Sequence, residues 1–398
     1  MEESGSDAAG RAAALARGAE ESLPAGGLED KLRTAEREGR PLRVKLGIDP
    51  TAPDIHLGHV VVLDKLRAFQ DAGHVVVLIV GDYTARVGDP SGRSSTRPVL
   101  SGEEIDANAQ TFQDQAHRVL DPDPAKVEVR RNGEWLNMPV DDLFALARTT
   151  TVAQILERDD FAQRFGAREP ISVLELLYPL LQGYDSVAVR ADVELGGTDQ
   201  KFNLLLGRDV QRAYGQPEQV ALTMPILPGT DGVQRMSKSL GNYVGVTEPP
   251  EEIYGKTLSI PDDAMPTWYR LLLHEEPDPA LGPRDRKRLL ARRLVERFHG
   301  AEAAAGAEAG FDRVHVAREA PAEIEESSFA AGDGSVHLPA VLEDVFGLSR
   351  SEARRLIAQG GVRLDGEPVP DPDVAAERLD GAVLQVGKRR FRRLRRAA

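Results

Sequence analysis

Two histidines stand three residues apart in the string His56-Leu57-Gly58-His59, which opens a segment with helical spacing. A helix N-terminus carries unpaired N–H groups and the positive end of the helix dipole, so it attracts phosphate. Two imidazoles one helical turn apart can donate to the same phosphate oxygens, and Gly58 lets a flat adenine ring approach the backbone. A pair of surface histidines is the alternative. A metal site is disfavoured because no third ligand lies nearby at metal-site spacing.

A second group of charged residues lies much later, in the string Arg235-Met236-Ser237-Lys238-Ser239. It follows the turn Asp231-Gly232 and is therefore expected on a loop. Cationic side chains on a mobile loop can close over a triphosphate and neutralise charge as pyrophosphate departs. Taken alone, such a loop is usually a solvated surface. Its position after the histidine string favours one shared nucleotide site.

The two strings resemble the two signature motifs of the class I aminoacyl-tRNA synthetases. Segments between and around them resemble the tyrosyl-tRNA synthetase family within that class, closely so from about residue 41 to residue 272. These segments are Gly47–Thr51, Gly88–Gly92, Tyr178–Asp185 and Gly196–Gln200. The resemblance implies an enzyme that activates L-tyrosine with ATP, releasing pyrophosphate, and transfers tyrosine to the 3′ end of tRNA(Tyr).

The resemblance also assigns roles to individual residues. It implies that the ATP phosphates and the reaction centre are contacted by Thr51, His56, His59, Arg235 and Lys238. It implies that the rest of the nucleotide lies against Gly58, Gly197 and Asp199. It implies that tyrosine is held by Asp49, Asp89, Tyr178, Gln182, Asp185 and Gln200, with Asp185 accepting the phenolic hydroxyl. Mg²⁺ is expected to arrive with ATP, held mostly by phosphates and water, with no metal bound by the protein itself.

Three positions depart from the best-studied branch of the family. Lys45 stands where that branch has a tyrosine that shares recognition of the hydroxyl, Glu194 stands where it has a glutamine, and Arg235 replaces the first lysine of the loop motif. Arginine keeps the charge but is a wider, flatter donor. These departures indicate a second bacterial-type subgroup. They leave Asp185 to act alone, with water, or with a different partner.

Two other functions remain open at this point. A tryptophanyl or other class I synthetase shares the expected fold. A paralogue kept for RNA binding or regulation is a second alternative, which the presence of both signature strings disfavours. Amino-acid-dependent exchange of pyrophosphate into ATP would separate them.

The elements that must position these residues alternate between strand and helix. An apolar run over 42–47, a helical pattern over 58–72 and the aliphatic run Val75–Val80 form a strand, crossover helix and strand. Such a unit predicts an α/β fold with a Rossmann-like, doubly wound parallel sheet. Further strands are expected at 127–130, 191–195 and 220–226, with a helical insert before the second of these.

The chain is expected to divide into five parts. They are an N-terminal helical lead-in (1–40), a catalytic nucleotide-binding domain with a helical insert (41–245), a helical domain (246–320), a linker (321–335) and a small α+β RNA-binding domain (336–398). The last part resembles an RNA-binding domain shared with a ribosomal small-subunit protein. From residue 336 onward there are twelve basic and nine acidic residues, so this segment is net positive, whereas the whole chain has a net charge of −14. The RNA contacts are expected at Arg350, Arg354, Arg355, Lys388, Arg389 and Arg390.

Composition excludes several classes of protein. There are no cysteines, so disulfide scaffolds, thiolate metal sites and cysteine nucleophiles are ruled out. The longest apolar run, Val75–Val80, is far too short to cross a membrane, and the acidic N-terminus does not resemble a signal peptide. A cytoplasmic enzyme is expected. The family resemblance implies that the enzyme is a homodimer, with the helical insert at its interface.

Overall fold

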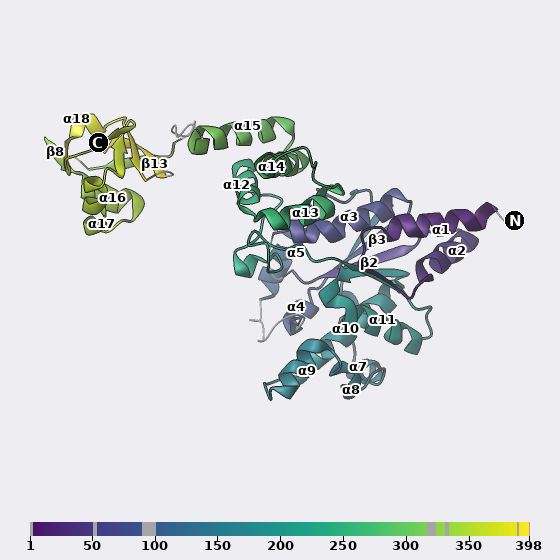
Figure 1. Ribbon diagram of the computed structural model, residues 1–398. Helices are drawn as coiled ribbons and strands as arrows, with labels where there is room; N and C mark the ends of the chain where they lie inside the picture. The colour runs from purple at the N-terminus through teal and green to yellow at the C-terminus, as the bar shows by residue number, and fades with distance from the viewer. Residues whose placement is uncertain are drawn as a thin grey trace. The chain divides into compact units, whose positions relative to one another are not determined.

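The computed structural model describes residues 3–50, 54–89, 101–316, 324–330, 334–387 and 390–397 (Figure 1). The chain forms two compact units. The first contains Met1–Pro249 and Lys256–Leu290, and the second contains Pro250–Gly255 and Ala291–Ala398.

The first unit is built on a six-stranded sheet with the order β1-β6-β5-β2-β3-β4. Its strands are β1 (Glu21–Leu23), β2 (Arg43–Ile48), β3 (Val75–Val80), β4 (Val127–Arg131), β5 (Val193–Gly197) and β6 (Val220–Met224). All neighbouring pairs from β6 to β4 are parallel. The continuous aliphatic run of β3 is almost wholly buried, as expected for a strand covered on both faces. The predicted doubly wound α/β fold is confirmed.

The sheet has one point where the strand order reverses. From β2 the chain adds β3 and β4 on one side, then returns to add β5 and β6 on the other side of β2. Because right-handed crossovers in opposite directions place their helices on opposite faces, α3 (Leu57–Asp71) and α11 (Lys201–Ala213) cover different faces of the sheet (Figure 1). Ligands of such sheets bind at the carboxyl ends of the strands beside this reversal. Here these are the ends of β2 and β5.

Helix α10 (Val173–Val189) carries much of the site and packs closely against α11. A Cβ on Gly183 would lie 3.0 Å from Val210, so a glycine lets the two helices approach. Ser172 begins α10 with a capping box to Glu175, as Ser101 does for α5 (Gly102–Ala116). The predicted insert contains α6 (Gly133–Leu136), α7 (Val140–Ala147), α8 (Val152–Ile155) and α9 (Asp159–Gly166).

The lead-in is not wholly helical, which corrects the sequence prediction for residues 1–40. Besides α1 (Glu3–Ala16) and α2 (Gly27–Glu38), it contains β1, which pairs antiparallel with β6. The three residues Glu21-Ser22-Leu23 carry little strand propensity. Pairing with the otherwise open edge of β6 satisfies backbone groups of both strands.

A helical region follows the loop that contains Arg235 and Lys238. Its helices are α12 (Pro250–Ser259), α13 (Met265–Trp268), α14 (Pro283–His299) and α15 (Ala301–Phe311). These helices lie within the helical domain expected at 246–320.

The C-terminal part forms a five-stranded sheet with the order β10-β9-β12-β13-β7. Its elements are β7 (Glu326–Phe329), β8 (Ser335–His337), α16 (Leu338–Phe346), α17 (Arg350–Ala358), β9 (Val362–Leu364), β10 (Glu367–Pro368), β11 (Asp373–Ala375), α18 (Ala376–Leu379), β12 (Val383–Val386) and β13 (Arg390–Arg396). Strand β7 corrects the sequence prediction, which placed 321–335 in a linker. The strand was not predicted because Glu326, Ser327 and Ser328 are polar. It pairs with β13 and buries Phe329.

Candidate active site

A cavity of about 670 Å³ opens at the carboxyl ends of β2 and β5. Every site residue predicted for the first unit lines it, apart from Thr51, which lies outside the described residues. The predicted residues that line the cavity are Asp49, His56, Gly58, His59, Asp89, Tyr178, Gln182, Asp185, Gly197, Asp199, Gln200, Arg235 and Lys238. Side chains from segments almost two hundred residues apart therefore face one space.

The two histidines lie at the start of α3. Their rings stack with centroids 3.9 Å apart, and the Nδ1 atom of His59 accepts the backbone N–H of His56 at 3.2 Å. Burial lowers the pKa of His59 to about 4 and the pKa of His56 well below its ordinary value. Both rings are therefore neutral near pH 7 and can act as N–H donors. A Cβ on Gly58 would lie 3.0 Å from the His56 ring and 3.6 Å from Met236, which explains the glycine.

The segment after the cationic loop pairs with the segment that leads into α3. The Leu57 amide donates to the carbonyl of Val244 at 2.9 Å, and the Val246 amide donates to the carbonyl of Ile55 at 3.0 Å. These backbone bonds tie the loop to the histidines, although the loop lies far along the chain.

Both loop cations contact carboxylates on the cavity wall. Arg235 Nη1 lies 2.9 Å from Asp199 Oδ2, and Lys238 pairs with Asp54. Burial raises the pKa of Asp199, while the charge of Arg235 opposes that rise. Any ligand that contacts Asp199 or Lys238 must replace these ion pairs by its own contacts.

Asp185 lies at the deep end of the cavity and is only 3% exposed. Its carboxylate accepts the Trp135 Nε1–H at 2.8 Å and an N–H of Asn132 at 3.4 Å. Burial raises the pKa of Asp185 to about 7, against the lowering effect of the Lys45 charge and of these two donors. The partners of the Asp185 carboxylate in this structure are therefore an indole N–H and an amide N–H. Lys45 Nζ itself bonds elsewhere.

Asp49 is held at the end of β2 by two hydroxyl groups. Tyr178 donates to Oδ2 at 2.9 Å and Thr84 donates to Oδ1 at 2.6 Å. Burial, followed by the charges of Asp49 and Asp89, raises the pKa of Tyr178. A Cβ on Gly81 would lie 2.1 Å from Asp49 Oδ1 and 2.4 Å from Thr84 Oγ1. The glycine at this position is thus required by the Asp49–Thr84 contact.

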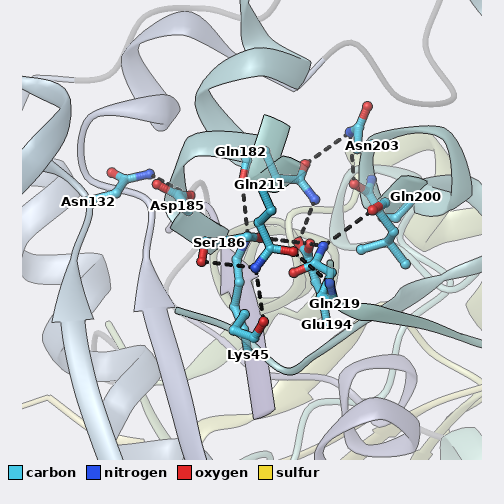
Figure 2. Close-up of polar contacts among 12 residues, drawn as sticks. Lys45, Asn132, Gln182, Asp185, Ser186, Glu194, Gln200, Asn203, Gln211 and Gln219 are labelled. Carbon is cyan, nitrogen blue, oxygen red and sulfur yellow. Dashed lines mark hydrogen bonds and ion pairs between the residues drawn. The ribbon is translucent and has the colours of Figure 1, made fainter. Parts of the chain in front are cut away.

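A chain of amides runs along one wall of the cavity (Figure 2). Asn203 Nδ2 donates to Gln182 Oε1 at 3.0 Å and to Gln200 Oε1 at 3.1 Å. Gln200 Nε2 then donates to Asp89 Oδ2 at 3.0 Å. Arg158 donates to Asn203 Oδ1 at 3.2 Å and lies 3.9 Å from Asp89. The predicted tyrosine-binding side chains Gln182, Gln200 and Asp89 belong to one hydrogen-bonded network.

Two of the departures from the best-studied branch prove to be partners. Lys45 and Glu194 are neighbours in the pairing of β2 with β5, and Lys45 Nζ lies 2.9 Å from Glu194 Oε1. Both side chains are completely buried, at 0% and 1% exposure. The buried positive charge of Lys45 is therefore balanced by the buried negative charge of Glu194.

Sequence reasoning missed several residues that hold the site in place. They are Asp54, Thr84, Asn132, Trp135, Arg158 and Asn203. Asn132 directly follows β4, and that position at a strand's carboxyl end was the available signal. Asp54 and Thr84 also line the cavity, whereas Trp135, Arg158 and Asn203 contact residues that line it. No local pattern marks these five residues.

The predicted RNA contacts in the C-terminal part lie on its surface. Arg350, Arg354, Arg355 and Arg390 are all exposed. Arg350 pairs with Glu343 at 2.7 Å, and the guanidinium of Arg390 lies 5.8 Å from the centroid of the Phe346 ring. Lys388 and Arg389 lie outside the described residues.

Two kinds of feature are absent from the part of the chain that the structure describes. None of the described helices is both long and apolar enough to cross a membrane. Among the same residues, no group of three or more histidine or acidic side chains is placed to hold a metal ion.

The sequence and the fold match known proteins along most of their length. Residues 37–315 match the family described as tRNA synthetases class I (W and Y), and residues 340–375 match the S4 domain. The tyrosine–tRNA ligase of Moorella thermoacetica is 53% identical over 96% of this chain and 94% of its own, and that of Coxiella burnetii is 50% identical over 92% and 94%. The structure of the Archaeoglobus fulgidus tyrosyl-tRNA synthetase complexed with L-tyrosine aligns with a TM-score of 0.62 and 25% identity, covering 76% of this chain and 99% of that one. The chain therefore belongs to the class I tRNA synthetases of the tryptophan and tyrosine type, and within them to the tyrosine–tRNA ligases.

Proposed function

We propose that this enzyme joins L-tyrosine to ATP, forming tyrosyl-adenylate and pyrophosphate, and then transfers tyrosine to the 3′ end of tRNA(Tyr). One observation carries the proposal. A single cavity has a helix N-terminus with two neutral histidines and a cationic loop at one end, and a buried aspartate at the other. The first end suits a triphosphate and the second suits a phenolic hydroxyl.

The nucleotide end is assigned to the residues around α3 and the loop. His56, His59 and Thr51 would donate to the phosphates, with Arg235 and Lys238 closing over them. Gly58 would admit the adenine ring, and Gly197 and Asp199 would lie against the ribose. A Cβ on Gly197 would lie 2.6 Å from Asp199 Oδ1, so a larger residue there would displace the carboxylate.

The amino-acid end is assigned to the walls formed by β2, α10 and the start of α11. Asp89, Tyr178 and Gln182 would hold the ammonium group, while Asp49 and Gln200 would lie near the carboxyl group. Asp185 would accept the phenolic hydroxyl. A phenylalanine would leave this buried acceptor without its partner, which is a costly loss in a dry site.

The chemistry of the first step needs no general base. The carboxylate of tyrosine is already a nucleophile and attacks the α-phosphorus of ATP, and negative charge builds up on the departing pyrophosphate. The protein contributes position and preorganised donors. Mg²⁺ would accompany ATP as its counter-ion and would be held mostly by phosphates and water.

The wider setting of the enzyme follows from the same proposal. Exposed apolar side chains on the insert and at the start of α10, including Val140, Phe144, Val152 and Val173, suit a homodimer interface. The basic C-terminal part would contact tRNA phosphates. A substrate of this kind implies a cytoplasmic enzyme.

Exchange of labelled pyrophosphate into ATP tests the proposal with three amino acids. Tyrosine is expected to support exchange, whereas phenylalanine and tryptophan at equal concentration are expected to support very little. Exchange driven by tryptophan would favour the tryptophanyl alternative. No exchange with any amino acid, in a protein that still binds RNA, would favour a binding paralogue.

A further inference from the structure

A buried ion pair lies behind the wall of the cavity that carries Gln182. Lys45 projects from β2 and Glu194 from β5 towards α10, and no ligand can touch either charge directly because both side chains are shielded from solvent (Figure 2). Two opposite charges in a sheet core are seldom favourable for stability alone, since apolar side chains of similar size do as well or better. Their contacts show what else the pair does.

Both ions are fully satisfied. The three N–H groups of Lys45 point at Glu194 Oε1, at the Ser186 hydroxyl 2.8 Å away and at the carbonyl oxygen of Gln182 2.9 Å away. The two oxygens of Glu194 accept from four donors, namely Lys45, Gln182 Nε2 at 3.2 Å, Ser186 at 3.1 Å and Gln219 Nε2. Four acceptor positions are what a carboxylate offers when it carries no proton.

An ionised carboxylate can only accept hydrogen bonds, so it determines which end of the Gln182 amide faces it. Nε2 must point towards Glu194, and Oε1 must point away, on the side of Asn203. A neutral amide at position 194 would remove this constraint because it could accept from Nε2 or donate to Oε1 equally well.

The other end of the network enforces the same direction. Arg158 is a donor without any acceptor, so it turns Asn203 to present Oδ1 to it and Nδ2 to the two glutamines. Gln182 is therefore oriented from both sides by charged groups. The side-chain oxygen Oε1 of Gln182 keeps a second lone pair, which can accept from a donor in the cavity.

We propose that Glu194, fixed by Lys45, is a positioning residue that orients the Gln182 amide so that its oxygen, and not its NH₂ group, faces the ammonium of the amino-acid substrate. The proposal rests on the function proposed above. It names the group of the substrate that depends on the buried pair, and it explains why the two departures, Lys45 and Glu194, occur together.

The test compares two ligands that differ only in the ammonium group. These are L-tyrosine and 3-(4-hydroxyphenyl)propanoate, whose dissociation constants are measured by calorimetry on the full-length enzyme. The test variant combines Lys45→Met with Glu194→Gln, which removes both charges at nearly constant volume and leaves no buried ion unpaired. Because Arg158 and Asn203 still favour the original amide direction, tyrosine should bind several-fold more weakly, and by at most the roughly tenfold expected for the loss of one hydrogen bond to a charged group. The propanoate should bind as it does to the wild type.

Ser186→Ala is the matched control. Ser186 contacts both ions but not the amide of Gln182, so its loss should leave the ratio of the two dissociation constants unchanged. An unchanged ratio in the double variant, or an equal change in Ser186→Ala, would overturn the proposal. If the double variant does not fold, Glu194→Gln alone is measured instead, and tyrosine but not the propanoate is again expected to bind more weakly. Wild-type enzyme that does not activate tyrosine at all would instead refute the proposed function.

Discussion

Burial determines the charge of the reactive groups at both ends of the cavity. At the nucleotide end, the lowered pKa values of His56 and His59 keep both rings uncharged, so their contribution is a directed N–H and not a positive charge. At the other end, the raised pKa of Asp185 means that this carboxyl ionises near neutral pH instead of at 3.8. Under the proposed function, the positive charge that faces the phosphates would come from Arg235 and Lys238.

Replacing the histidines should therefore change the rate of tyrosine activation and not the affinity for tyrosine. Replacing His59 by Asn is expected to lower kcat for exchange by about two orders of magnitude, the usual effect of losing one donor to a transition state, with the KM for tyrosine little changed. Because the His59 pKa is about 4, wild-type kcat should show no histidine titration between pH 6 and 8. A kcat that rises or falls tenfold across that range with the pKa of an ordinary histidine would contradict this description.

Tyrosine binding should depend on pH through Asp185. Because burial raises the pKa of this carboxyl from 3.8 to about 7, the folded, ligand-free enzyme keeps its proton where an unfolded chain would lose it. This group's contribution to stability is thus fully present below pH 3.8 and is lost as pH rises through 7. The phenolic O–H binds the ionised form best, so the dissociation constant for tyrosine should fall as pH rises from 5 to 7 and then level off. Calorimetry on the Asp185→Asn variant should show no such dependence.

At the level of elements, the reversal of strand order brings the site together. The loop that follows β2 supplies Asp49, the short 3₁₀ turn Thr198–Gln200 after β5 supplies Asp199 and Gln200, and α3 supplies His59. The close approach of these segments needs small residues at defined positions.

Gly81 is the clearest of these positions. Gly81→Ala would force its Cβ into the Asp49–Thr84 hydrogen bond, and overpacking of this kind costs about 1–3 kcal/mol. We expect lower stability to urea and a raised KM for tyrosine. Gly102→Ala is the control because a Cβ there meets no atom within 4 Å. Equal behaviour of the two variants would show that the contact is unimportant.

The sequence predicted the elements whose signal is local. The aliphatic run of β3 and the helical spacing of α3 indicated the sheet and the crossover correctly. The two signature strings indicated segments that line one cavity. What it could not show were contacts that depend on tertiary pairing. Lys45 and Glu194 lie on separate strands far apart in the chain, and nothing local reveals that β2 and β5 are neighbours. The short strands β1 and β7 were missed for the same reason, since each is stabilised by a distant partner strand.

Over the whole molecule, charge is divided between an acidic body and a basic C-terminal part. Exposed arginines at both ends of that part suit the phosphates of tRNA, and such contacts release counter-ions on binding. Transfer of tyrosine should therefore be sensitive to salt, whereas activation of tyrosine should not.

Replacing Arg350, Arg354 and Arg355 by Gln tests this division. Aminoacylation should fall and its dependence on salt should become shallower, by roughly 0.7–0.9 in the log–log slope for each phosphate that is no longer neutralised, while pyrophosphate exchange stays unchanged. Arg378→Gln, an exposed arginine in α18, is the control. A parallel loss of exchange would mean that the triple variant damages the fold or that the arginines serve the first step.

Discrimination between tyrosine and phenylalanine shows whether the buried Asp185 defines the substrate. Tyrosyl-tRNA synthetases are the documented example of strong discrimination between these two amino acids, and their preference for tyrosine, about 10⁵, is taken here as given. The ratio of kcat/KM for the two amino acids in pyrophosphate exchange should be of that order in the wild type and should fall at least about a hundredfold in Asp185→Ala. A wild type that accepts phenylalanine within about tenfold of tyrosine, or an Asp185→Ala variant that keeps the full preference, would contradict the account.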